Sequence, residues 1–142
     1  MKNLAVMTMC WLVTSFNYYL IQFLVNTFKQ VYTTAIFSSI SELIGIAAGG
    51  SLYSQLGLKV SLSMSFSLAF VGAILIIMYG LAHQDSYLFP LFVLIAKLGI
   101  SSAFNILYVS HNDVFPVLFA ATALGLANFV TRIFTGLSPI LA

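Results

Sequence analysis

Residues 60–82 read VSLSMSFSLAFVGAILIIMYGLA and contain no charged residue. Polar and apolar residues do not alternate strictly along the whole stretch, as they would in the strands of a membrane β-barrel. A helix crosses a bilayer core of about 30 Å with about 20 residues, and this stretch is long enough to do so. It therefore predicts a membrane-spanning α-helix, and with it an all-α fold class.

The composition extends this prediction to the whole chain of 142 residues, of which 61% are hydrophobic and 6% are charged. Soluble domains carry about 25% charged residues, and disordered chains are less hydrophobic, so both classes are excluded. The net charge is +2, and no cluster of Lys and Arg offers a surface for nucleic acid. The single cysteine, Cys10, excludes an intramolecular disulfide. The remaining class is a polytopic membrane helix bundle.

Breaks in hydrophobicity divide the chain into about five spans of bilayer-crossing length. The breaks fall at Lys29-Gln30, at Gly57, at residues 83–86 and at residues 111–116, where charged, polar or turn-forming residues gather. The predicted spans form a single transmembrane domain over residues 1–142 and lie at about 4–28, 32–53, 60–82, 88–110 and 122–141. We therefore expect a multi-pass integral membrane protein.

Five spans would place the two termini on opposite sides of the membrane. Lys2 and Lys59 would share one side and Lys29 would lie on the other, so the positive-inside rule favours a cytoplasmic N-terminus. Lys2 and the apolar residues 4–13 also resemble the start of a secretory signal peptide. The apolar stretch continues to Phe28 without a small-residue cleavage site, which favours a membrane span.

Four of the five predicted spans carry polar or small residues along one helical face, at spacings of three and four residues. These faces consist of Trp11, Ser15, Tyr18, Gln22 and Asn26; Ser38, Glu42, Gly45 and Gly49; Lys97, Ser101, Asn105 and Tyr108; and Asn128, Arg132, Thr135 and Pro139. The third span has serines near one end and is otherwise apolar. The pattern predicts four helices around a polar space, with the third toward lipid. For the small residues alone, a role in close helix packing is the alternative.

Three charged residues, Glu42, Lys97 and Arg132, lie well inside predicted spans. Each is about 15 Å from the start of its span at helical rise, which is near the bilayer midplane. A lone charge there costs at least about 2.5–3.5 kcal/mol, so we expect Glu42 to pair with Lys97 or Arg132. Two interpretations remain. The pair holds helices in register, or the charges form a substrate or proton site, where the surplus positive charge suits an anionic group.

The chain offers no candidate for catalysis or metal binding. His83 and His111 are predicted to lie in solvated loops, far from the polar groups near the midplane. No cluster of His, Asp and Glu has the spacing of metal ligands, and no nucleophile has a nearby base. We therefore expect neither an enzyme nor a cofactor.

These residues also form motifs of a known transporter family. The motifs are Trp11 followed by Tyr18-Tyr19; an aromatic-led run from Tyr32 to Glu42; a connection from Gly50 to Gly57 followed by Lys59; Lys97 followed by Gly99; Tyr108 with a box from Asp113 to Pro116; and Asn128, Arg132, Gly136 and Pro139. In this order and spacing, the chain resembles helices seven to eleven of a major facilitator superfamily transporter, in the C-terminal half of that fold. It is nearest to the organic cation and organic anion transporter branch.

The resemblance implies a secondary transporter, or the C-terminal part of one, that moves small organic ions or related solutes by alternating access. It implies a conformational latch that includes Lys59 and Asp113, although Ala120 stands where the family box has an arginine. Candidate residues that bind substrate or line the cavity are Trp11, Tyr18, Gln22, Glu42, Lys97, Asn105 and Arg132.

The partners expected from this interpretation are the lipid bilayer, a small organic solute, and either a missing N-terminal half or another membrane protein chain. Nucleic acid is not among them. The alternative interpretation is a truncated, transporter-like membrane subunit that has a structural or assembly role and does not transport.

Overall fold

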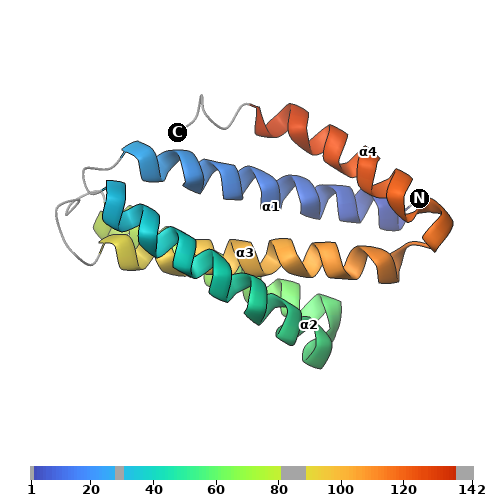
Figure 1. The fold of residues 1–142 in the computed structure, drawn as a ribbon, viewed down its shortest axis with the longest axis horizontal. Coiled ribbons are helices and arrows are strands. Elements are labelled where there is room, and N and C mark those ends of the chain that lie inside the picture. The colour runs from blue at the N-terminus through green and yellow to red at the C-terminus, as the bar shows by residue number, and fades with distance from the viewer. Residues whose placement is uncertain (1, 28–30, 81–88, 137–142) are drawn as a thin grey trace.

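The computed structural model describes residues 2–27, 31–80 and 89–136. These residues form four α-helices, α1 (Lys2–Thr27), α2 (Val31–Leu75), α3 (Phe89–Val114) and α4 (Val117–Thr135), and a π-helical turn, η1 (Ile76–Gly80). Figure 1 shows them as a bundle of elongated helices. No strand occurs in these ranges, so the all-α prediction is confirmed.

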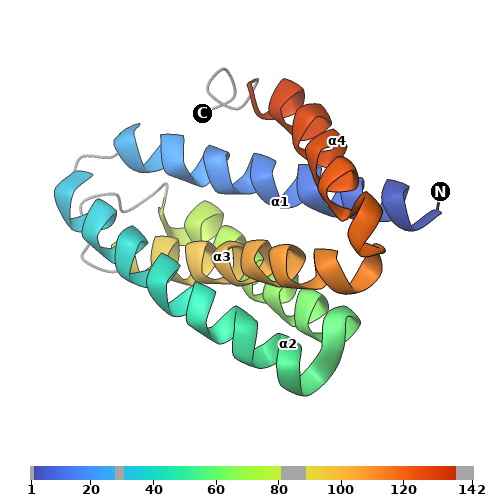
Figure 2. The same cartoon turned by 45° about the vertical axis from the view of Figure 1, so that its right-hand side comes forward.

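Helix α2 folds back on itself at Gly57. Its backbone there has φ 74° and ψ 174°, a conformation that is essentially restricted to glycine. The Ser61 hydroxyl donates a hydrogen bond of 2.8 Å to the carbonyl of Leu52 across the turn. Figure 2 shows the two arms, residues 31–56 and 58–75, running in opposite directions from this point. Helix α2 therefore supplies two antiparallel helical segments, and η1 continues the second.

The remaining helix bounds differ from the predicted spans mainly near the C-terminus. Helix α3 runs to Val114 rather than to about residue 110, and α4 starts at Val117 rather than near residue 122. Pro116 directly precedes α4 with φ −56°, and proline favours such helix starts because it has no N–H to leave unpaired. The last predicted residues of the fifth span lie outside the described residues.

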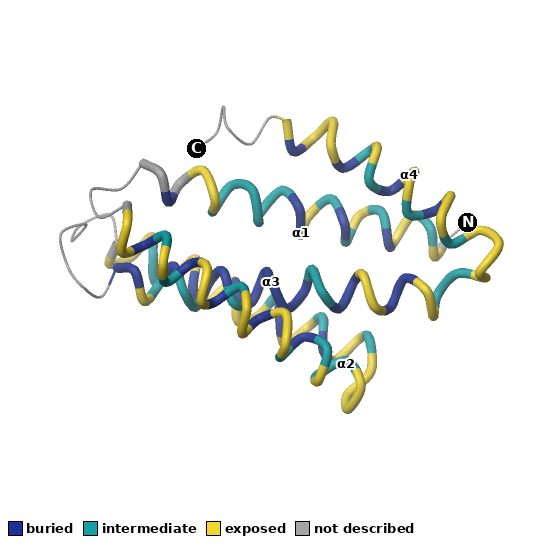
Figure 3. The backbone as a smooth tube through the Cα atoms, in the orientation of Figure 1, coloured by how far each residue is buried: buried dark blue, intermediate teal, exposed yellow. Residues whose placement is uncertain are grey.

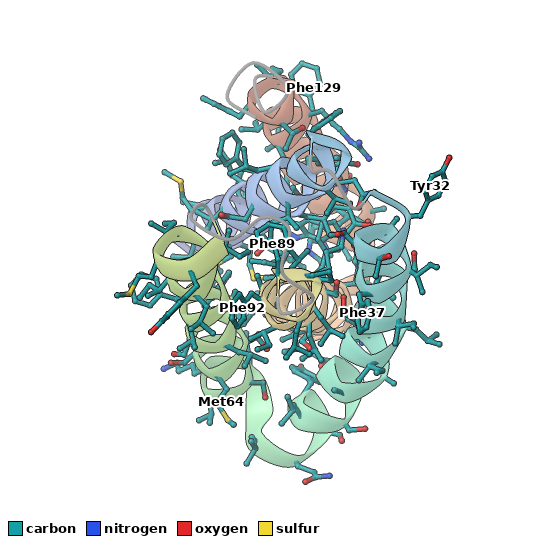
Figure 4. The ribbon with its side chains drawn as sticks, turned by 90° about the vertical axis from the view of Figure 1, so that its left-hand side faces the viewer. Tyr32, Phe37, Met64, Phe89, Phe92 and Phe129 are labelled. Atoms are coloured by element: carbon teal, nitrogen blue, oxygen red, sulfur yellow. The ribbon has the colours of Figure 1, made fainter. Side chains whose placement is uncertain are left out.

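Helix α3 lies at the centre of the bundle. In the end-on view of Figure 4 the two arms of α2 flank it and α1 lies beside it, whereas α4 leans against α1. Figure 3 shows that buried residues are frequent along α3 and sparse on the outer helices. Large apolar side chains such as Tyr32, Met64 and Phe129 point outward in Figure 4, as expected of lipid-facing surfaces. The chain is a multi-pass membrane protein.

Glycines set the distance between α2 and α3. A Cβ atom added to Gly72 would lie 2.4 Å from the backbone nitrogen of Ala96, and one on Gly99 would lie 2.5 Å from that of Ala69. A Cβ on Gly49 would lie 2.7 Å from the carbonyl oxygen of Ser102. The packing role considered for Gly49 is therefore confirmed, since only glycine permits these backbones to approach so closely.

Candidate functional site

A cavity of about 340 Å³ lies between the helices. Its described lining comes from α1, the first arm of α2, α3 and α4, and none of it from residues 58–80. The lining side chains are Tyr18, Tyr19, Glu42, Ile46, Ser101, Phe104, Asn105, Tyr108 and Arg132. These are the four helices on which the sequence shows polar faces, so the faces meet at one place.

Glu42, Lys97 and Arg132 lie near this cavity at different distances from the start of their helices. Glu42 lies about 16 Å along its helix from Val31, and Lys97 lies about 12 Å from Phe89. Arg132 lies in the last turn of α4, about 22 Å from Val117, rather than about 15 Å from its helix start as expected. It still borders the cavity, because α4 starts earlier than predicted and is inclined to α1 (Figure 1).

Lys97 is completely buried, and three groups surround its ammonium. Nζ donates a hydrogen bond of 2.7 Å to Oε1 of Gln22 and lies 3.9 Å from Oε2 of Glu42. It also lies 3.7 Å from the centroid of the Tyr18 ring, a favourable position for a cation. The predicted pairing of Glu42 with one of the two cations is confirmed for Lys97.

Glu42 joins this buried network to the cavity. Its Oε1 accepts a hydrogen bond of 2.6 Å from the Tyr18 hydroxyl, while Oε2 faces Lys97. The side chain of Glu42 is 35% exposed, whereas that of Lys97 is 0% exposed. The carboxylate therefore lies at the cavity surface and the ammonium behind it.

Arg132 has an uncharged partner. Its Nη1 donates a hydrogen bond of 2.7 Å to the hydroxyl oxygen of Tyr19, and its Cζ lies 5.6 Å from the Tyr19 ring centroid. In the ranges that the structure describes, no carboxylate forms an ion pair with Arg132. Sequence reasoning placed Tyr18 at the site and missed Tyr19, because adjacent helical residues point about 100° apart and only one fits a given stripe.

Asn105 connects α3 to α2 by a hydrogen bond at the cavity wall. Its Nδ2 donates a hydrogen bond of 2.7 Å to the carbonyl of Ile46. One turn earlier, the Ser102 hydroxyl donates a bond of 2.9 Å to the carbonyl of Gly45. The donors of both side chains are thereby used between helices, which orients the α3 face toward the cavity.

Neither Trp11 nor Gln22 lines the cavity. Trp11 lies behind its wall, whereas Gln22 is exposed. Trp11 is fully buried, and its ring centroid lies 4.5 Å from that of Tyr108 and 5.3 Å from that of Phe104, both of which line the cavity. Gln22 reaches the site by its hydrogen bond to Lys97. These two residues shape the cavity through the side chains that they contact.

The two expected latch residues lie in different helices: Asp113 in the last turn of α3, and Lys59 in the second arm of α2. Oδ2 of Asp113 accepts a hydrogen bond from the hydroxyl of Tyr53 in the first arm of α2. Lys59 is exposed just after the Gly57 turn, and within the described part of the chain it forms no ion pair with Asp113. The contact that joins these helix ends is therefore a hydrogen bond from tyrosine.

The prediction of a solvated loop is wrong for His111. It lies in the last turn of α3 with 2% of its surface exposed, because that helix continues to Val114. Its Nε2 lies 2.8 Å from the carbonyl oxygen of Ala120, and its ring packs on Phe115. The ring thus connects α3 to the first turn of α4. No group of three metal-ligating side chains gathers in the described ranges.

Some residues of the sequence interpretation are not described. Lys29, His83 and Pro139 lie outside the described residues, as do the side chains of Lys2 and Asn26.

Two curated proteins share sequence with this chain. Organic cation/carnitine transporter 7 of Arabidopsis thaliana is 25% identical over 111 residues, which cover 78% of this chain and 21% of the relative. Solute carrier family 22 member 4 of Mus musculus is 24% identical over 143 aligned positions, which cover 97% of this chain and 26% of the relative. The chain resembles organic cation transporters of the major facilitator superfamily. It spans about a quarter of the length of these relatives. No family model and no solved structure matches it.

Proposed function

We propose that this chain is part of a secondary transporter and that the cavity between α1, α2, α3 and α4 holds the transported solute. The observation that carries the proposal is one cavity that is lined by Glu42 and Arg132, with the buried Lys97 paired to Glu42 behind its wall. Intramembrane charges are costly and usually mark a substrate or ion path. Transporter sites commonly lie near the bilayer midplane, and the named relatives are transporters.

We further propose that the solute is a small organic anion. Lys97 is balanced by Glu42, whereas the partner of Arg132 is the neutral Tyr19, so the described cavity carries one uncompensated positive charge. A guanidinium binds carboxylate or phosphate groups with paired, charge-assisted hydrogen bonds. The rings of Phe104 and Tyr108 offer an apolar wall for the rest of the molecule. One relative is named for organic cations and carnitine, so this preference rests on the charge balance of the cavity.

The proposed mechanism is alternating access between this bundle and a second one. The second bundle would come from the missing N-terminal half of a longer polypeptide or from another membrane protein chain. Two observations support this arrangement: the chain spans about a quarter of its relatives, and its outer helix faces are apolar. Rocking of one bundle against the other would open the cavity to each side in turn. Lys59 and Asp113, at the cytoplasmic end of this scheme, would belong to its latch.

The test is uptake by liposomes that contain the complete gene product, with radiolabelled benzoate as an aromatic anion and benzyltrimethylammonium as an aromatic cation. Arg132→Gln removes the uncompensated charge, and we expect kcat/KM for benzoate to fall about tenfold to a hundredfold. Asn128→Ala is the matched control, because Asn128 lies one turn away on α4 and, among the described residues, forms a hydrogen bond only to Leu124 of its own helix. This control should keep uptake at the wild-type rate.

The other outcomes separate the alternatives. Uptake of the cation but not of benzoate would contradict the anion preference and leave the transporter proposal standing. Uptake of neither probe, together with stable co-purification of another membrane protein, would favour the truncated structural subunit.

A further inference from the structure

Two neighbouring tyrosines hold the two halves of the charged site. The Tyr18 hydroxyl donates to Glu42, and its ring lies under Lys97. The Tyr19 hydroxyl accepts from Arg132, and the ring of Tyr19 packs edge-on against that of Tyr18 with centroids 5.5 Å apart. The acid and one cation are therefore joined to each other, while the second cation is held separately on Tyr19.

We propose that the Tyr19 hydroxyl occupies the position at Arg132 that the anionic oxygen of the substrate takes, so that Tyr19 is an internal placeholder which the substrate displaces. This inference rests on the proposed function and adds a specificity-determining residue to it. Tyr19 and Arg132 both line the same cavity, so a solute within it can reach the contact between them.

The energetics of the exchange favour anions. A guanidinium within the membrane region needs a hydrogen-bond acceptor, and the phenol oxygen of Tyr19 supplies a neutral one. The phenol of Tyr19 accepts one hydrogen bond from Arg132, whereas a carboxylate adds an opposite charge and can accept two parallel bonds from a guanidinium. A carboxylate therefore gains more at Arg132 than the phenol loses. A neutral or cationic solute has no such gain, and the Tyr19 contact therefore selects against both.

Tyr108 provides a matched comparison at the same cavity. It lines the cavity and its ring packs against Trp11 and Phe104, but in the described part of the chain its hydroxyl has no hydrogen bond to a cation. Removing the hydroxyl of Tyr108 changes the polarity of the wall without releasing Arg132. Removing the hydroxyl of Tyr19 releases Arg132 and keeps the ring beside it.

The test compares Tyr19→Phe with Tyr108→Phe in the complete gene product reconstituted in liposomes. We expect Tyr19→Phe to lower the KM for benzoate about threefold to tenfold, because the substrate no longer has to break a hydrogen bond. The inhibition constant of benzamide, which has the same shape without the charge, should change less than twofold. Tyr108→Phe alters the wall of the same cavity without releasing Arg132, so any shift that it causes should be equal for benzoate and benzamide.

The possible outcomes distinguish failure of the Tyr19 placeholder from failure of the proposed transport function. If the wild-type protein transports benzoate and Tyr19→Phe leaves its KM unchanged or raises it, the placeholder is wrong and the proposed function stands. An equal shift for benzoate and benzamide would also overturn the placeholder, since it would reflect a change in cavity shape. If the wild-type protein neither transports benzoate nor is inhibited by it, the proposed function and this inference both fail.

Discussion

Glu42 and Lys97 share one contact but are buried to different extents. The ammonium of Lys97 is 0% exposed, and its only charged partner in the described chain is the carboxylate of Glu42. That carboxylate is 35% exposed and also accepts a hydrogen bond from Tyr18. The buried ammonium therefore needs its counter-charge more than the partly exposed carboxylate does.

This asymmetry predicts unequal effects of neutralising the two residues. Glu42→Gln leaves a buried ammonium without a counter-charge, which we expect to cost about 3–5 kcal/mol of stability. Lys97→Met leaves a partly exposed carboxylate that keeps its tyrosine bond, so the loss should be smaller. The double variant should be more stable than Glu42→Gln alone, because no buried charge remains. Thermal unfolding midpoints in detergent measure the order, and a midpoint for Lys97→Met below that of Glu42→Gln would contradict it.

At the scale of elements, glycines decide how α2 and α3 pack. Gly72 in the second arm of α2 lies against Ala96 of α3, and Gly99 in α3 lies against Ala69 of α2. Each helix thus contributes a glycine at which the backbone of the other helix comes close. In contrast, an added Cβ on Gly125 in α4 meets nothing within 4 Å. The two positions carry the same residue type in helices and differ in their surroundings.

We predict opposite effects of the same substitution at these positions. Gly72→Ala places a methyl group 2.4 Å from the Ala96 backbone nitrogen, so the helices must separate, at a cost of about 1–3 kcal/mol or more. Gly125→Ala meets open space and gains helix propensity, so stability should stay the same or rise by up to about 1 kcal/mol. Thermal midpoints and the yield of monodisperse protein after gel filtration report both effects. Equal losses at both positions would show that the crossing between α2 and α3 does not need Gly72.

At the scale of the whole molecule, the helix ends and turns gather at two opposite ends of the bundle. The start of α1, the turn at Gly57 and the connection from α3 to α4 lie at one end of the bundle, and the start of α2 lies at the other (Figure 1). The positive-inside rule, applied to Lys2 and Lys59, predicts that the first of these ends faces the cytoplasm.

Site-directed labelling checks this topology. In a Cys10→Ser background, we introduce Gln55→Cys and Asn112→Cys at the first end and Tyr32→Cys at the other, all at exposed positions. In cells that carry the protein in the plasma membrane, a membrane-impermeant maleimide should label Tyr32→Cys without permeabilisation and the other two only after it. Labelling of Gln55→Cys and Asn112→Cys from different sides would contradict the hairpin in α2, whereas a shared but external location would only reverse the orientation.

Sequence patterns captured those parts of the site that depend on one helix at a time. Polar spacing selected Tyr18, Glu42, Asn105 and Arg132, which line the cavity. The charge argument anticipated a partner for Glu42, because a lone intramembrane charge is costly whatever the helix arrangement. The same reasoning failed for His111, since a polar residue near a predicted helix end looks solvated until the neighbouring helix is placed.

The amino-acid sequence alone determined the all-α membrane class and the helices that carry polar faces. Composition and period are local properties, and the bilayer requires each crossing segment to satisfy its own backbone. Only the tertiary structure decided that Lys97 is paired with Glu42 while Arg132 rests on Tyr19. That choice depends on how the helices tilt and rotate against each other, which is set by packing between α2 and α3 and by where α4 begins.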